Sequence, residues 1–255
     1  MNRVIFNRKG GVGKSTITCN LAAISASKGH KTLVIDLDTQ GNSTHYLLGY
    51  RTDELESTLA NFYSSTLSVS LFPKDFNEYI YKTNVENLYV MPSHPDMDDL
   101  HSKLESRYKI YKLKEALEKM GDFDNIFIDT PPALNFYTKS ALIAVDNCII
   151  PFDCDVFSKQ ALYSLLETIE EVKIDHNPAI NIEGIIVNQF QKRAKLPVQL
   201  VNELLDDGMP LFKTMISPSV KIRESHSANQ PLIQYAPTHK VTEEFKSLYA
   251  ELNND

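Results

Sequence analysis

Short apolar runs rich in β-branched residues alternate along the chain with longer stretches of helical periodicity. The predicted strands are VIF near the N-terminus, 32–38, 87–93, 125–131, 147–153, 182–190 and, more weakly, 211–216. Because these runs are apolar at nearly every position, we expect the strands to be buried on both faces. The predicted helices are Gly13–Lys28, 98–119, 135–145, 156–175, 196–206 and about 238–253.

This alternation predicts an α/β fold with a doubly wound, mostly parallel sheet and helices on both faces. No repeat, linker or break in composition divides the chain, so residues 1–255 are predicted to form a single domain. The segment 50–86 is expected to provide short helices and loops that cover the sheet. Ligands of such sheets bind at the carboxyl ends of the strands. The polar residues expected there are Lys14, Asp36, Asp38, Asp129 and Asn188.

The composition is that of an ordinary soluble protein, with 42% hydrophobic and 23% charged residues. The three cysteines form no C-x-x-C pair and lie in or beside apolar runs, which favours buried thiols in a reducing compartment. Met1 leads directly into the first predicted strand, and no apolar run approaches the ~20 residues that span a membrane. A cytoplasmic protein is therefore expected.

The stretch NRKGGVGKST, residues 7–16, follows the phosphate-binding pattern G-x-x-x-x-G-K-[ST], except that Arg8 occupies the first glycine position. A strand, a glycine-rich turn and a helix present backbone N–H groups and a helix N-terminus to an anion. Lys14 is expected to bridge the β- and γ-phosphates of ATP, and the Ser15 hydroxyl to ligate Mg²⁺. The predicted nucleotide-binding residues of this loop are Lys9, Gly10, Gly11, Val12, Gly13, Lys14, Ser15 and Thr16.

Lys9 is a second lysine, five residues before Lys14. It precedes the glycine-rich turn, so we expect its side chain to point across the mouth of the site rather than onto its own γ-phosphate. There it would neutralise charge on a nucleotide held by a second copy, as an arginine finger acts in trans. The alternative is a solvated lysine beside Arg8.

Carboxylates end two of the predicted strands, in VIDLDTQGN (34–42) and IFIDTPP (126–132). Asp36 fits the second shell of a Mg²⁺ ion, and Asp38 is placed to orient a water at the γ-phosphate. Asp129 has the form of an acid that serves Mg²⁺ through Ser15 or a water. The alternative for both Asp36 and Asp38 is a solvated loop with a helix cap at Asp38 or Thr39.

Asn188 ends the apolar run GIIVNQF. A side-chain amide both donates and accepts hydrogen bonds, so it can read an adenine edge. A turn residue is the alternative at this position.

The segments KGGVGKST, DLDTQGNST, IDTPP and the tail SPSVKIRESHSANQPLIQYAPTHKVTEEF together resemble the ParA/Soj branch of the ParA–MinD ATPases, over nearly the whole chain. The resemblance implies a deviant Walker A ATPase that forms an ATP-sandwich homodimer with Mg²⁺. Such a dimer binds DNA nonspecifically, and a ParB-like or other partner protein stimulates its slow hydrolysis.

The family's roles are transferred here by motif. Lys9 becomes the signature lysine that reaches the partner subunit's nucleotide, Asp38 positions water, and Asp129 is the Walker B acid. Asn188 falls at the adenine-reading position, and Pro218 in the tail is assigned to the nucleotide site. The sequence departs from the family pattern in two places. Thr39 replaces a usual proline, and a common E-A-P reads Glu224, Ser225, His226.

Between positions 189 and 223 the chain has six basic and three acidic residues, although its net charge is −7. The segment lacks base-reading features, so DNA binding there would act through phosphates and depend steeply on salt. The predicted DNA-binding residues are Lys192, Arg193, Lys195, Lys221 and Arg223, with an ordinary solvated patch as the alternative. The C-terminal TEEFKSLYAELNND is acidic, which argues against a basic amphipathic membrane anchor.

The function expected from these features is a nucleoid-associated ATPase that partitions a plasmid or chromosome. A ParA-like ATPase that positions a protein cargo, such as a chemotaxis, flagellar, secretion or cellulose-synthesis apparatus, is the alternative. An iron–sulfur carrier is disfavoured because no paired cysteines lie in an exposed glycine-rich loop. A metabolic ligase on the same fold is disfavoured because no substrate-binding insertion is evident.

Overall fold

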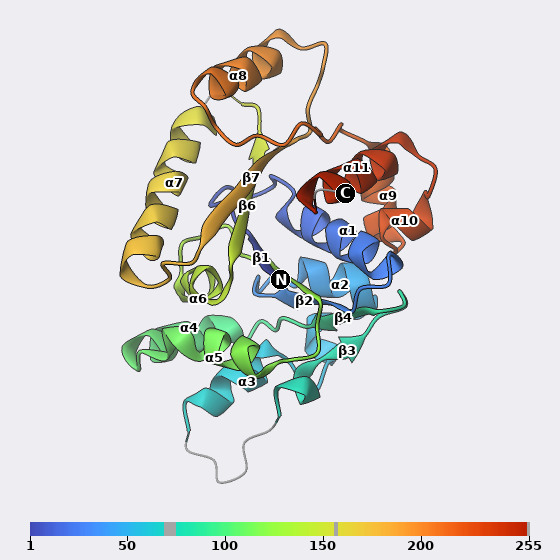
Figure 1. Ribbon diagram of the computed structural model, residues 1–255. Helices are drawn as coiled ribbons and strands as arrows, with labels where there is room; N and C mark the ends of the chain where they lie inside the picture. Colours follow the sequence, from blue (N-terminus) through green and yellow to red (C-terminus); the bar gives the residue numbers. More distant parts are fainter. Residues whose placement is uncertain (69–74, 156–157, 254–255) are drawn as a thin grey trace.

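The computed structural model describes residues 1–68, 75–155 and 158–253. Within these residues, seven strands form one sheet in the order β3-β4-β2-β5-β1-β6-β7 (Figure 1). They are β1 (Asn2–Ile5), β2 (Thr32–Asp36), β3 (Tyr81–Lys82), β4 (Leu88–Met91), β5 (Asn125–Asp129), β6 (Asn147–Asp153) and β7 (Asn181–Asn188). Every neighbouring pair is parallel except β3 and β4. The predicted doubly wound, mostly parallel sheet is confirmed.

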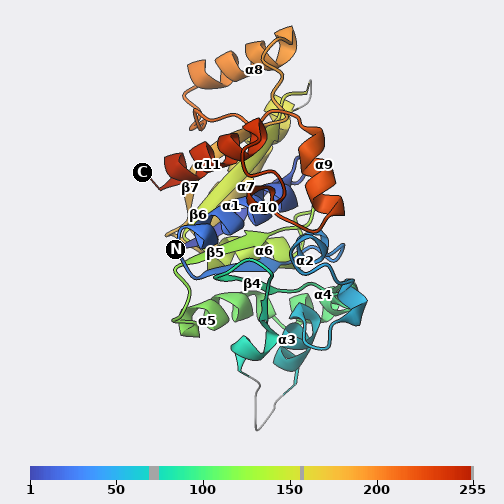
Figure 2. The same ribbon diagram turned by 90° about the vertical axis from the view of Figure 1, so that its right-hand side faces the viewer.

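Helices cover both faces of this sheet (Figures 1 and 2). In β1, Val4 enters the apolar core on one face and Ile5 enters the core on the other, as the continuous apolar pattern predicts. The Ile5 face packs against α1 (Lys14–Ser27), α2 (Asn42–Leu48), α10 (Leu232–Tyr235) and α11 (Lys240–Leu252). The Val4 face packs against α3 (Leu59–Thr66), α4 (Met97–Ser106), α5 (Lys112–Lys119), α6 (Phe136–Ala144) and α7 (Ser158–Asp175).

Two further helices lie towards the carboxyl ends of the strands. The first, α8 (Lys195–Asp206), extends beyond β7 in both views, and α9 (Val220–Ser227) lies close to α2 (Figure 2). Among the helices that the structure describes, none is both long and apolar enough to span a membrane.

Most predicted helices are confirmed to within a few residues, namely α1, α6, α7, α8 and α11. Residues 156–157 of the predicted helix 156–175 lie outside the described residues. The single helix predicted over 98–119 is wrong, because α4 ends at Ser106 and α5 begins at Lys112. Between them Tyr108 adopts a left-handed φ of 55°, which an α-helix does not accommodate. No glycine or proline marks this break in the sequence.

The weak strand predicted over 211–216 is also wrong. This segment forms one isolated bridge to β7, at Leu211. The Phe212 amide still donates to the Ile185 carbonyl of β7 at 3.0 Å. The amides of Lys213 and Thr214 donate to the Glu251 carboxylate at 2.6 and 3.0 Å instead of joining a ladder. The seventh strand is β3, a two-residue strand in the segment predicted as short helices and loops.

That segment, 50–86, otherwise has the predicted character. It holds α3 and two short 3-10 helices, Thr52–Glu54 and Phe76–Tyr79. Its residues 69–74 lie outside the described residues. The helices α2, α9 and α10 were not predicted, and two of them turn out to border the candidate site.

A buried ion pair joins the first strand to the last. Arg3 in β1 is fully buried, and its guanidinium donates to the Glu183 carboxylate of β7 at 2.8 and 2.9 Å. The same guanidinium donates to Asn125 of β5 and to Asn253 after α11, at 3.3 Å each. One side chain therefore connects three strands and the C-terminal helix.

We expect Arg3→Met to lower the free energy of unfolding by about 3 kcal/mol, because it leaves the Glu183 carboxylate without its charged partner. Urea unfolding followed by circular dichroism measures this loss. Adding Glu183→Met should recover most of it. Arg51→Met is the matched control, because the Arg51–Asp53 pair is exposed and its loss should cost below about 1 kcal/mol. Equal losses in the two single variants would contradict the structural role of Arg3.

Candidate functional site

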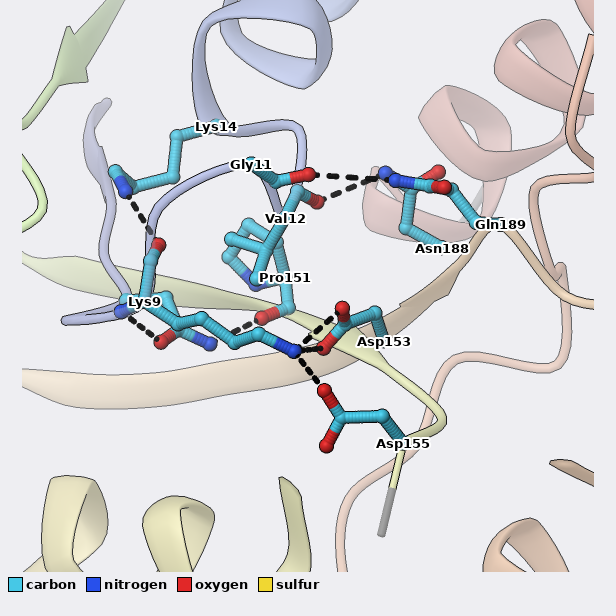
Figure 3. A network of polar contacts seen from close by, with 10 residues as sticks. Lys9, Gly11, Val12, Lys14, Pro151, Asp153, Asp155, Asn188 and Gln189 are labelled. Carbon is cyan, nitrogen blue, oxygen red and sulfur yellow. Dashed lines mark hydrogen bonds and ion pairs between the residues drawn. The ribbon is translucent and has the colours of Figure 1, made fainter. Parts of the chain in front are cut away.

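The loop between β1 and α1 takes its shape from two glycines. Gly11 and Gly13 have φ angles of 76° and 93°, in the left-handed region that favours glycine. A Cβ on Gly13 would lie 2.3 Å from Nδ2 of Asn188, so space as well as conformation requires glycine. Asn188 Nδ2 donates to the Val12 carbonyl at 2.8 Å, and Gln189 donates to the Gly11 carbonyl at 3.3 Å (Figure 3). The end of β7 therefore holds the loop from one side.

Two adjoining cavities open at this loop. The first, of about 350 Å³, is lined by Gly10, Gly11, Gly13, Lys14, Ser15, Thr16, Asp38, Gln40, Asn42, Pro132 and His226. The second, of about 460 Å³, is lined by Gly11, Gly13, Thr16, Asn188, Gln189, Pro218, Ser219, Val220, Ile222 and Arg223. The structure thus brings most of the predicted loop residues together with Asn188 and Pro218. Lys9 lines neither cavity, and Val12 is buried.

Lys14 is buried at the floor of the first cavity and is the first residue of α1. Its Nζ donates to the Lys9 carbonyl at 3.0 Å. Burial lowers the pKa of Lys14, against the opposing effect of Asp129 and Asp38. A buried ammonium at a helix N-terminus is a strong feature for binding an anion.

Asp36 and Asp129 lie next to each other at the carboxyl ends of β2 and β5. Asp36 accepts hydrogen bonds from the Thr44 amide and hydroxyl, both at 2.7 Å, and Asp129 accepts one from the Ser43 hydroxyl at 2.7 Å. Burial raises the pKa of Asp36 well above its usual range, and Asp129 adds to this effect. Burial also raises the pKa of Asp129 to about 6, although the Ser15 and Ser43 hydroxyls favour the charged form.

One oxygen of this pair is available to a cation. Oδ1 of Asp129 is buried and accepts no hydrogen bond from the residues that the structure describes. The Ser15 hydroxyl acts on the same carboxylate, and Mg²⁺ prefers such hard oxygen ligands. Ser15 and Asp129 therefore fit the predicted metal site. The two oxygens of Asp36 already accept from Thr44 and from the Asp38 amide, which favours a structural role for Asp36.

Asp38 is buried and lines the first cavity together with Lys14 and Ser15. Its Oδ1 accepts a hydrogen bond from the Gln40 amide at 3.0 Å. Neither Asp38 nor Thr39 caps a helix, because Gly41 is the residue that precedes α2. The carboxylate is thus held within the cavity by its own loop.

The Lys9 side chain extends away from Lys14 toward Asp153 and Asp155 (Figure 3) and lines neither cavity. Its Nζ lies 2.7 Å from the Asp153 carboxylate at the end of β6 and also forms an ion pair with Asp155. Burial lowers the pKa of Lys9, but its hydrogen bonds to Asp153 and Asp155 raise it by more. The predicted direction across the mouth is therefore not the one seen here, and a role in trans stays a prediction.

The predicted DNA-binding residues lie near the second cavity. Lys192, Arg193, Lys195 and Arg223 are exposed, whereas Lys221 is half-buried and pairs with Glu224 at 2.7 Å. A wider hollow of about 850 Å³ beside α8 is lined in part by Lys192, Arg193 and Pro218. Pro218 lines the second cavity as well, so the basic surface adjoins the loop. Glu203 and Asp206 share a further hollow with Lys195, which makes this surface mixed in charge.

Several residues around the first cavity were not predicted, and His226 on α9 has the most distinctive contacts. Its Nε2 lies 3.0 Å from Thr16 Oγ1, and its ring stacks on Tyr46 with centroids 3.9 Å apart. Burial lowers the pKa of His226, and His45 adds to the shift. In the sequence, His226 was marked only by its departure from the E-A-P pattern, and that departure did not indicate that the residue lies in the site.

Comparisons with known proteins agree with this geometry. A family model described as AAA domain matches residues 3–182. The chromosome partitioning protein ParA of Myxococcus xanthus is 33% identical over 251 residues, which cover 97% of this chain and 86% of that protein. The sporulation initiation inhibitor protein Soj of Bacillus subtilis is 32% identical over 251 residues, with 97% and 96% covered.

A solved structure of cobyrinic acid a,c-diamide synthase from Mycobacterium smegmatis, with a bound ATP analogue and magnesium, has the same fold. It superposes with a TM-score of 0.84 at 23% identity and covers 97% of this chain and 92% of that one. The sequence matches extend over almost all of the sheet and the loop described above. The chain therefore belongs to the AAA domain family and, within it, to the ParA–MinD type of ATPase.

Proposed function

We propose that this chain is an ATP-dependent dimerising switch that binds nonspecific double-stranded DNA and partitions a plasmid or chromosome with a stimulating partner protein. The observation that carries the proposal is the first cavity, where Lys14, Ser15 and Asp38 meet at a glycine-shaped loop. The names of the ParA relatives, which refer to chromosome partitioning, support this process.

The two cavities fit the two ends of a nucleoside triphosphate. The phosphates would lie against the loop amides, the N-terminus of α1 and Lys14, and the base would lie beside Asn188 and Pro218. Ser15 and Asp129 would hold Mg²⁺, which supplies charge neutralisation at the phosphates. Asp38 would orient the water that attacks the γ-phosphate.

The proposed dimerisation gives Lys9 a role in trans. In the single chain its ammonium is engaged by Asp153 and Asp155, so it adds no charge to its own cavity. A second copy that supplies Lys9 across the interface would complete each site. Hydrolysis would then be slow until two chains and a partner protein assemble, and the dimer would double the cations on the surface that holds Arg193 and Arg223.

An ATPase that positions a protein cargo is the second candidate. The ion pair between Lys221 and Glu224, together with the acids of α8, favours it, because these carboxylates reduce the positive charge available for DNA phosphates. Both candidates use the same nucleotide switch, and DNA affinity separates them.

Three variants test the switch. We expect Lys14→Ala to lose nucleotide affinity, because it removes the buried ammonium. Lys9→Ala should still bind ATP yet not dimerise, and Asp38→Ala should accumulate as an ATP-bound dimer that hydrolyses poorly. Size-exclusion chromatography with light scattering, with and without ATP, measures each state. An Asp38→Ala protein that stays monomeric with ATP would argue against the sandwich dimer.

The carboxylates that engage Lys9 should oppose dimerisation. We expect the double variant Asp153→Asn with Asp155→Asn to dimerise at about fivefold lower ATP concentration, since two partly exposed ion pairs together contribute about 1 kcal/mol. Light scattering across an ATP titration gives the midpoint. Glu115→Gln, which breaks an ion pair on α5 instead, is the control and should not move it. A higher midpoint in the double variant would show that these acids favour the dimer.

Duplex affinity tests the partitioning role. With ATP present, we expect wild type to bind random duplex DNA at low salt, and Arg193→Ala with Lys221→Ala to weaken binding at all sequences. The plot of log affinity against log salt should become less steep, with the magnitude of its slope smaller by about 1 for each phosphate that the variant no longer neutralises. Fluorescence anisotropy measures both quantities, and Lys119→Ala on α5 is the control. If wild type shows no duplex binding at low salt, the cargo-positioning candidate is preferred.

A further inference from the structure

The helix α9 touches the nucleotide cavities with one side and solvent with the other. Ser225 and His226 face inwards, where Ser225 Oγ lies 2.9 Å from the Tyr46 hydroxyl. Arg223 lines the second cavity and is exposed. Among the contacts of the described residues, the one between His226 and Thr16 joins α9 to the start of α1, directly after the loop.

The hydrogen bond between His226 and Thr16 can run in either direction, and a bound phosphate would decide which residue donates. Burial lowers the pKa of His226, so its ring is neutral at neutral pH, with one donor and one acceptor nitrogen. The Thr16 hydroxyl has one proton to donate. If that proton goes to a phosphate oxygen in the first cavity, the hydroxyl oxygen must accept from Nε2–H of His226, 3.0 Å away. The stacked Tyr46 ring fixes the orientation of the imidazole for this donation.

We propose that His226 is a positioning residue of the nucleotide site, which directs the Thr16 hydroxyl to a phosphate of the bound nucleotide and thereby links phosphate occupancy to α9. This inference rests on the proposed function, because it requires a nucleotide at the loop. Hydrogen bonds in such a chain polarise and strengthen one another. Binding of a nucleoside diphosphate or triphosphate therefore tightens the contact between α9 and the loop.

Two substitutions separate the hydrogen bond from the packing. His226→Phe keeps a ring on Tyr46 but removes the donor, and we expect it to weaken ADP affinity about tenfold, the effect of losing support for a hydrogen bond to a charged group. His226→Gln keeps a donor and should stay within about threefold of wild type. His176→Phe is the matched control, because this histidine also bonds a hydroxyl, that of Tyr111 at 2.9 Å, but lies away from both cavities. Isothermal titration calorimetry of the full chain with ADP gives the affinities.

A double-mutant cycle shows whether His226 acts through Thr16. In a Thr16→Val background, His226→Phe should change ADP affinity by less than about twofold, because the hydroxyl it positions is gone. Hydrogen exchange supplies the second readout. ADP should slow exchange of the α9 amides in wild type and in His226→Gln, but not in His226→Phe.

The outcomes are distinct. If wild type does not bind ADP, the proposed function fails. If wild type binds and His226→Phe binds equally well, or if the Thr16 and His226 effects add fully, the positioning role is overturned while the proposed function stands. Equal losses of affinity in His226→Phe and His226→Gln, together with equally lowered melting temperatures, would also overturn it, since they indicate a packing role alone.

Discussion

Two neighbouring carboxylates buried at the ends of β2 and β5 are the constraint on which the site depends. Asp36 and Asp129 cannot both carry full charge in an apolar environment without compensation. The first turn of α2 supplies part of it through Ser43 and Thr44, and the buried ammonium of Lys14 adds a smaller part at Asp129. The unpaired oxygen of Asp129 leaves a place for a cation. One electrostatic requirement therefore connects α2, the loop and α1, in addition to their apolar packing.

The sequence was sufficient for the sheet and the loop because their signals are local. Continuous apolar runs specify strands that are buried on both faces, and glycines at fixed spacing specify a curled turn before a helix. The break at Tyr108 and the absence of the 211–216 strand had no such signal. The helix break depends on one backbone angle, that of Tyr108. The missing strand depends on Glu251, a distant carboxylate that accepts hydrogen bonds from the amides of Lys213 and Thr214.

The same limit applies within the site. The composition of the loop places Lys9 at its entrance, but the direction of its side chain depends on Asp153 and Asp155, which follow about 144 residues later. Likewise, α2 and α9 border the cavity through contacts such as Thr16 with His226, which are 210 residues apart in the chain. The sequence pattern was enough to find the carboxylates at the strand ends. It did not identify the residues of α2 that donate hydrogen bonds to these carboxylates, or the acids that pair with Lys9.

These long-range contacts bring four helices into one unit. Tyr46 of α2 stacks on His226 and bonds Ser225, both on α9, while Asn20 of α1 donates to the same tyrosine hydroxyl and accepts from the Leu232 amide of α10. The carboxylates beneath α2 and the basic side chains on α9 are therefore separated by a few packed side chains rather than by a flexible loop. The Tyr46, Ser225 and His226 side chains thus form a packed connection between α2, beside the first cavity, and the helix that carries Arg223.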